Sequence, residues 1–215
     1  MLTKLAIASL ALATTLLCSA SAGATPLGPS SGFLPTYSGP QNGDLDVASG
    51  EAFLRGTNFE FDATFNAPIG TTNGVFYVWG IGRGLNIAPF GAFRPGVLFD
   101  AVVVSAPSLN TSFVFDLISN QMTALLPNQV DVSGDTLKHF VPTSLLPSKG
   151  FLLSDYLVNL WPRDGLDTSD VTQIAEFAPS NSDVGVTVPE PLSVSLFGTG
   201  LVAAAALRRR RKTSQ

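Results

Sequence analysis

The feature that most limits how this chain can fold is the strict alternation of apolar and polar side chains over residues 58–66. The apolar positions are Phe59, Phe61, Ala63 and Phe65, and the polar positions between them are Glu60, Asp62 and Thr64. Because successive side chains of a β-strand point to opposite faces of a sheet, this period of two predicts a strand with one buried face. We therefore expect 58–66 to be a half-buried strand.

Further apolar runs are separated by clusters of Gly, Pro, Asn and Ser, which are typical of turns. These runs cover residues 75–81, 97–104, 112–118, 130–132, 136–141, 156–161 and 184–188. Ser133-Gly134-Asp135 is expected to be a hairpin turn. The sequence shows no sustained apolar period of 3.6 residues, apart from a short turn around 171–177. Eight or nine short strands without helical connections predict an all-β fold, an antiparallel β-sandwich.

The first 24 residues have the order of a secretory signal peptide. Lys4 precedes 13 residues without a charge, from Leu5 to Leu17, and small residues follow. Ala20-Ser21-Ala22 and Ala22-Gly23-Ala24 are the two candidate cleavage sites for signal peptidase. The sequence therefore predicts an N-terminal signal helix over 1–24 and export across the inner membrane.

The C-terminal segment has the order of a membrane anchor. An apolar stretch of 16 residues runs from Leu192 to Leu207, and a basic block of Arg208, Arg209, Arg210, Arg211 and Lys212 follows. As a helix the stretch would span about 24 Å, which is less than the roughly 30 Å of a hydrocarbon core. Because positive residues stay on the cytoplasmic side, this predicts a single, marginal transmembrane helix with its tail inside.

Val188, Pro189, Glu190 and Pro191 precede this span. The Pro-Glu-Pro motif, the short span and the basic block together resemble the PEP-CTERM sorting signal over residues 189–212. That resemblance implies an exported protein of a Gram-negative bacterium that makes exopolysaccharide. It also implies that exosortase, a membrane-embedded processing enzyme, acts near the motif. Two prolines favour extended backbone there, which suits a processing enzyme.

The segment between the two ends is strongly acidic. Residues 25–188 contain six basic and 15 acidic residues, a net charge of −9, and their composition divides them into a Pro/Gly/Ser-rich arm over 25–43 and a domain over 44–188. The arm is expected to be a linker or a loosely draped segment. A domain of this charge is unsuited to nucleic acid. The only cysteine, Cys18, lies in the signal peptide, so the mature domain lacks disulfides, a cysteine nucleophile and cysteine-ligated zinc.

Several segments of 44–188 resemble, loosely, the DOMON-like and carbohydrate-binding β-sandwiches of exported proteins. The segments are Asp44-Leu45-Asp46-Val47-Ala48, Phe59-Glu60-Phe61, Val75-Phe76-Tyr77-Val78-Trp79-Gly80, Leu98-Phe99-Asp100-Ala101-Val102-Val103-Val104 and Tyr156-Leu157-Val158-Asn159-Leu160-Trp161. Several members of that group carry an acidic residue just after the Trp-containing strand. Here Gly80-Ile81-Gly82-Arg83-Gly84 stands at that place.

The sequence alone does not identify a set of catalytic residues. The G-x-S-x-G match at 28–32 lies in the proline-rich arm, and the glycine-rich stretch 80–84 is not followed by a helix. His139 is the only histidine. It is expected to be a strand residue that points to the opposite side from Leu137.

Asp164, Asp167 and Asp170 are three residues apart in an acidic loop. Calcium takes six to eight oxygen ligands, so this loop is the candidate metal site. The spacing also suits a solvated turn or an N-cap, which the sequence favours. Tyr77, Trp79, Tyr156 and Trp161 are candidate sugar-stacking rings if they face outward, although aromatic residues of strands more often form a core.

We expect an exported β-sandwich that is cut by exosortase after transient membrane anchoring and delivered to the cell surface or the extracellular matrix. Its role is expected to be structural or ligand-binding, with exopolysaccharide as the candidate partner and no cofactor. Two alternatives remain. One is a secreted hydrolase that acts on matrix polymer through paired carboxylates, and the other is a permanently anchored protein on the periplasmic face.

Overall fold

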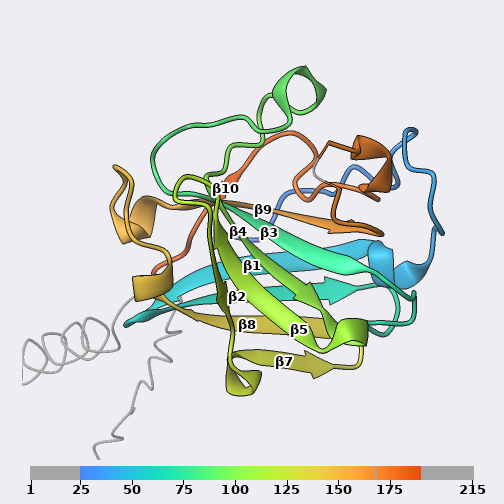
Figure 1. Ribbon diagram of the computed structural model, residues 1–215, viewed down its shortest axis with the longest axis horizontal. Helices are drawn as coiled ribbons and strands as arrows, with labels where there is room; N and C mark the ends of the chain where they lie inside the picture. The colour runs from blue at the N-terminus through green and yellow to red at the C-terminus, as the bar shows by residue number, and fades with distance from the viewer. Residues whose placement is uncertain (1–24, 168, 190–215) are drawn as a thin grey trace, which may run out of the picture. The chain divides into compact units, whose positions relative to one another are not determined.

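The alternating segment forms strand β2 (Asn58–Phe65), in which every second side chain is buried. The computed structural model of the protein describes residues 25–167 and 169–189. Within these residues the chain forms two antiparallel sheets, one of four and one of six strands, so the expected all-β antiparallel architecture is confirmed (Figure 1).

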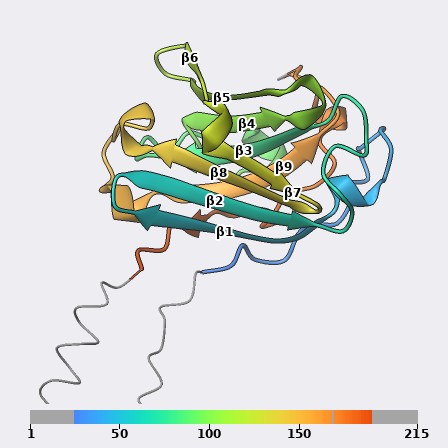
Figure 2. The same cartoon turned by 90° about the horizontal axis from the view of Figure 1, so that it is seen from below.

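The four-stranded sheet has the order β1-β2-β8-β7, with β1 (Val47–Arg55), β8 (Thr136–Pro142) and β7 (Val130–Ser133). The six-stranded sheet has the order β10-β9-β3-β4-β5-β6. Its strands are β10 (Val184–Gly185), β9 (Leu157–Arg163), β3 (Phe76–Gly82), β4 (Ala101–Ala106), β5 (Thr111–Asp116) and β6 (Gln121–Ala124). In Figure 2 the longer strands of both sheets run in roughly the same direction, as in an aligned sandwich.

In the part of the chain that the structure describes, the helices are all 3-10 helices of three residues each. They are η1 (Gly43–Leu45), η2 (Gly91–Phe93), η3 (Pro107–Leu109), η4 (Pro127–Gln129), η5 (Thr143–Leu145), η6 (Leu153–Asp155) and η7 (Val171–Gln173). None of the helices in the described ranges is long and apolar enough to cross a membrane. The predicted signal helix over 1–24 and the predicted transmembrane helix from Leu192 to Leu207 lie outside these ranges.

The core between the sheets is built by aromatic contacts from β2. The ring of Phe61 lies 5.4 Å from that of Trp79 in β3, and Phe65 lies 4.9 Å from Tyr77. Phe59 stacks on Tyr156 at 5.2 Å, just before β9 begins. Such ring pairs add specific geometry to the large apolar area that they bury. The inward face predicted for β2 is thus the face that joins the two sheets.

The six-stranded sheet is also covered on its other face, which is why all seven residues of β3 are buried. The long loop between β3 and β4, at the top of Figure 1, places Phe90 and Phe99 against Trp161 at ring distances of 5.3 and 4.8 Å. A Cβ at Gly80 would lie 2.5 Å from the Trp161 ring. Any side chain at position 80 would therefore displace the Trp161 indole from its observed place.

Residues 25–43 differ from the loosely draped arm expected from their composition. Leu27, Leu34 and Tyr37 are buried in the core. The backbone N–H of Leu34 donates to Ala175 O at 2.7 Å, and that of Leu27 donates to Gly50 O at 2.7 Å. The arm therefore packs as a part of the folded unit.

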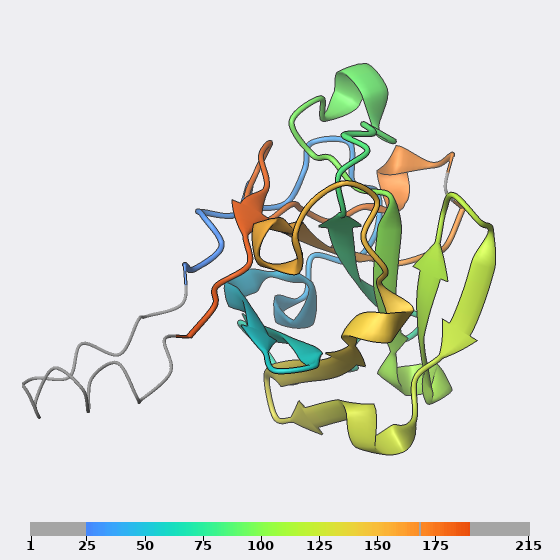
Figure 3. The same ribbon diagram turned by 90° about the vertical axis from the view of Figure 1, so that its left-hand side faces the viewer.

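The two ends of the described chain lie side by side along the edge of β1 (Figure 3). The backbone N–H of Thr25 donates to Thr187 Oγ1 at 2.8 Å. Thr187 in turn exchanges backbone hydrogen bonds with β1, donating to Ala52 O and accepting from Leu54 N at 2.8 Å each. These contacts occupy backbone groups that would otherwise be free on an edge strand.

Candidate functional site

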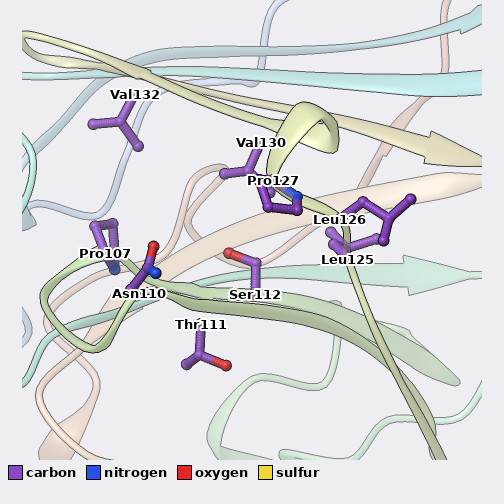
Figure 4. A pocket seen from close by; sticks show the side chains of 9 residues that line it. All are labelled: Pro107, Asn110, Thr111, Ser112, Leu125, Leu126, Pro127, Val130 and Val132. Atoms are coloured by element: carbon purple, nitrogen blue, oxygen red, sulfur yellow. The ribbon is translucent and has the colours of Figure 1, made fainter.

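A pocket of about 380 Å³ lies where the β4–β5 turn faces the chain that crosses from β6 to β7 (Figure 4). Its apolar lining residues are Pro107, Leu125, Leu126, Pro127, Val130 and Val132, and its polar lining residues are Asn110, Thr111 and Ser112. This volume is within the range of small-molecule sites, about 300–1,000 Å³. Both sheets contribute to the pocket, so it forms only when the sandwich is closed.

Two proline-started turns shape the pocket walls. Pro107 begins η3, and Asn110 ends it in the left-handed conformation with φ 49°, a backbone region that asparagine tolerates better than most residues. Pro127 begins η4, where the backbone N–H of Leu126 donates to Gln129 Oε1 at 2.7 Å. The N–H of Leu125 donates to Ser112 O at 2.8 Å, which holds the crossing segment against β5.

The pocket lining contains no ionisable side chain. This is notable because residues 25–188 carry a net charge of −9. The polar lining residues are Asn110, Thr111 and Ser112, and the rest of the lining is apolar. In Figure 4 Ser112 stands up from β5 toward Pro127 and Val130, whereas Thr111 points to the other side of the strand. The lining therefore suits an uncharged ligand.

Behind the pocket, Ser112 is the outer member of a hydrogen-bonded chain that crosses the sandwich. Ser112 Oγ lies 2.6 Å from Ser105 Oγ on β4, and Ser105 Oγ lies 2.6 Å from His139 Nε2 on β8. Ser105 and Ser112 are cross-strand partners, and His139 pairs with Val130, which also lines the pocket. Strand pairing brings Ser105 to Ser112 and His139 to Val130, and the packing of one sheet on the other brings Ser105 to His139.

His139 is completely buried, and burial lowers its pKa to about 3. The imidazole is therefore neutral at ordinary pH. Its Nδ1 has no hydrogen-bond partner among the described residues, so nothing there orients it as the aspartate of a catalytic triad would. The expectation that Leu137 and His139 point to opposite sides is wrong. Both are buried, since residues two apart share a face of a strand.

A second polar cluster surrounds Arg83, which is fully buried at the end of β3. Its Nη1 lies 2.9 Å from Asp116 Oδ2, its Nε lies 2.5 Å from Asp100 Oδ1, and its Nη2 donates to Asp100 O at 3.2 Å. Burial alone would lower the pKa of Arg83, but hydrogen bonds and charges from Asp116 and Asp100 raise it overall. Lys149 Nζ lies 3.8 Å from Asp116. The cluster ties together β3, β4, β5 and the 147–151 loop.

The two carboxylates of this cluster are held in place by ion pairs and hydrogen bonds. Asp116 Oδ1 accepts from the backbone N–H groups of Ile118 and Ser119, each at 2.9 Å. Burial would raise the pKa of Asp116, yet the Arg83 and backbone hydrogen bonds hold it well below its usual range. Neither Asp100 nor Asp116 has the freedom that a general acid needs.

The candidate calcium loop is held by local hydrogen bonds. Asp167 Oδ1 accepts from Ser169 N and Oγ at 2.9 and 2.6 Å, and Asp170 Oδ1 accepts from Thr172 N and Oγ1 at the same distances. Asp170 is the N-cap of η7. Across the described ranges no three His, Cys, Asp or Glu side chains are arranged to hold a metal ion, so Asp164, Asp167 and Asp170 gain no support as a metal site.

The four candidate stacking rings all lie in the core. Tyr77, Trp79 and Tyr156 are fully buried, and Trp161 is 2% exposed. None of them can serve as an open platform for a sugar. The reason is that both faces of the six-stranded sheet are covered, which the sequence of one strand does not reveal.

Of the expected sorting residues, only Val188 and Pro189 lie within the described ranges, where Val188 is exposed. Glu190, Pro191, the span from Leu192 to Leu207 and the basic block from Arg208 to Lys212 lie outside them.

Comparison with known proteins gives no relative for this chain: no family model, no curated protein and no solved structure matches it.

Proposed function

We propose that this chain is an exported protein whose C-terminal signal is processed by exosortase, and whose β-sandwich then serves a structural or ligand-binding role at the cell surface or in the extracellular matrix. One observation carries the proposal. Pro189-Glu190-Pro191, the apolar stretch from Leu192 to Leu207 and the block from Arg208 to Lys212 follow one another in a chain that begins with a signal-peptide pattern.

The structure near the motif is compatible with processing. Thr187 is held on β1 by backbone hydrogen bonds, and Val188 is 47% exposed. Access to the chain therefore begins at the residue before the motif. Prolines at 189 and 191 disfavour helix there, so an extended backbone can enter the cleft of a processing enzyme.

A binding role is favoured over hydrolysis by the two acids beside Arg83 and by the lining of the pocket. A glycoside hydrolase needs two carboxyl groups about 5–9.5 Å apart in a cleft. Asp100 and Asp116 are both bound to Arg83, and the 380 Å³ pocket has no carboxylate in its lining.

Mass spectrometry of the protein recovered from cells tests the sorting proposal. We expect the mature chain to end near Glu190, without residues 208–212. Replacing Pro189, Glu190 and Pro191 together with alanine should leave the chain in the inner membrane with its arginines attached. A strain without exosortase is the control, and it should retain the wild-type tail. Recovery of the wild-type chain from the inner membrane with its tail intact would instead support a permanent anchor.

A further inference from the structure

We propose that the pocket between β5 and the η4–β7 segment binds an uncharged ligand rich in hydroxyl groups, such as a sugar unit of a neutral polysaccharide. Ser112 is the polar contact, and Ser105 and His139 are positioning residues that act through it. This inference rests on the ligand-binding role proposed above and gives that role a site and a ligand class.

The lining sets the charge and shape of the ligand. Val130, Val132 and Leu125 offer apolar surface on the side that faces Ser112 and Asn110. A sugar ring has the matching character, with C–H groups on its faces and hydroxyls around its edge. An anionic ligand would enter without a compensating cation in the lining, against the field of an acidic domain. Neutral sugars are therefore favoured over uronic acids.

The hydrogen bonds that join Ser112, Ser105 and His139 can run in either direction, so Ser112 has two hydrogen-bonding states. When Nε2 is unprotonated, Ser105 donates to it and accepts from Ser112, so the Ser112 oxygen offers a lone pair to the pocket. When Nε2 carries the proton, it donates to Ser105, which donates to Ser112, and the Ser112 O–H is free to donate. The tautomer of His139 thus decides whether the Ser112 O–H is used by Ser105 or is free to donate into the pocket.

Both states are accessible because Nδ1 has no partner to fix the tautomer. A ligand with hydroxyl groups can bind to Ser112 in either state, since each hydroxyl can donate and accept a hydrogen bond. Packing alone does not account for the imidazole. Leu137 and Val141 fill the neighbouring inward positions of β8 with apolar side chains. His139 instead leaves its Nδ1 buried without a partner among the described residues, and such a buried unpaired group needs an explanation.

The single histidine makes the proposal directly measurable. The full chain is purified in detergent with a tag that lacks histidine, and the ¹⁵N shifts of Nδ1 and Nε2 report the tautomer of His139. The probes are cellobiose, maltose, lactose and mannobiose, with glucuronic acid as the charged arm. We expect at least one neutral disaccharide to shift the His139 signals saturably, and glucuronic acid to bind more weakly.

Variants separate a positioning role from a structural one. Ser112→Ala should weaken the binding about 2- to 12-fold, the usual range for one neutral hydrogen bond. Ser105→Ala should abolish the His139 response even where some binding remains. Ser133→Ala, on an exposed position of β7, is the matched control and should leave both unchanged. Amide spectra establish that each variant is folded.

The proposal is overturned if no neutral disaccharide shifts the His139 signals, if Ser112→Ala responds like the wild type, or if glucuronic acid binds best. These results do not depend on sorting, because the chain is studied before any processing. A retained C-terminal tail in cells would count against the sorting proposal alone, and a silent titration would count against the pocket alone.

Discussion

At the scale of single residues, the ion pairs of this protein differ in how deeply they are buried. Arg83 is fully buried with Asp100 and Asp116, whereas the ion pair of Arg55 and Glu60 lies at the surface, with 51% of the arginine side chain exposed. The attraction in a buried pair mainly offsets the loss of hydration. Removing one member is therefore far more damaging than the pair is stabilising.

This contrast gives a prediction for two arginines. Arg83→Met leaves Asp100 buried without a cation and leaves Asp116 with only Lys149, 3.8 Å away, so it should lower the free energy of unfolding by about 3–5 kcal/mol. Arg55→Met should lower it by less than about 1 kcal/mol, because water screens an exposed pair. Urea denaturation of both variants measures the difference. Similar small losses would mean that the Arg83 cluster is open to water.

At the scale of elements, the sequence predicted strands well where apolar residues alternate or form runs. The expected strand over 58–66 ends one residue earlier, and 75–81 became β3 (Phe76–Gly82). Two strands were missed. β1 contains Ser49, Gly50 and Glu51 in its middle, and the four residues of β6 are all exposed, so neither presents an apolar pattern.

The pocket could not be predicted for a different reason. Ser105, Ser112 and His139 meet through strand pairing and the approach of the two sheets, and serine in a strand has no distinctive signal. The arm over 25–43 was misjudged because its prolines and glycines obscured three buried side chains, Leu27, Leu34 and Tyr37. In both cases long-range contacts outweigh local composition.

The packed arm yields a prediction at this scale. Leu34 is 4% exposed, so Leu34→Ala should lower the free energy of unfolding by about 2–5 kcal/mol. Leu152→Ala, at a site that is 71% exposed, is the matched control and should change it by less than about 0.5 kcal/mol. Equal effects in urea denaturation would show that the arm does not contribute to the core.

At the scale of the whole molecule, two carboxyl groups of the acidic domain, Glu176 and Asp183, are shielded from water and form no ion pair within the described residues. Glu176 accepts a hydrogen bond from the backbone N–H of Val47, and Asp183 accepts one from that of Leu98 at 2.9 Å. Burial raises the pKa of each to about 7. In the unfolded chain both would ionise near pH 4. Between about pH 4 and pH 7 the folded state therefore binds more protons than the unfolded state, and this contribution to stability falls as pH rises.

Glu176→Gln tests that relation, since the amide keeps the shape and cannot ionise. The free energy of unfolding of the variant minus that of the wild type is the quantity to compare. We expect this difference to be up to about 3 kcal/mol larger at pH 8 than at pH 5. Urea denaturation at the two pH values provides the measurement. Asp131→Asn, on exposed β7, should show no such gain. If Glu176→Gln and the wild type respond to pH alike, Glu176 is hydrated in the folded protein.

The hydrogen bond from Thr25 to Thr187 also has a topological consequence. Because Thr25, the first described residue, meets Thr187 beside β1, a short linker can join the two ends of the described chain without moving β1, and the chain can be reopened at the exposed hairpin around Gly134. The sandwich is thus suited to circular permutation, and equally to insertion as a cassette into a surface loop of another protein.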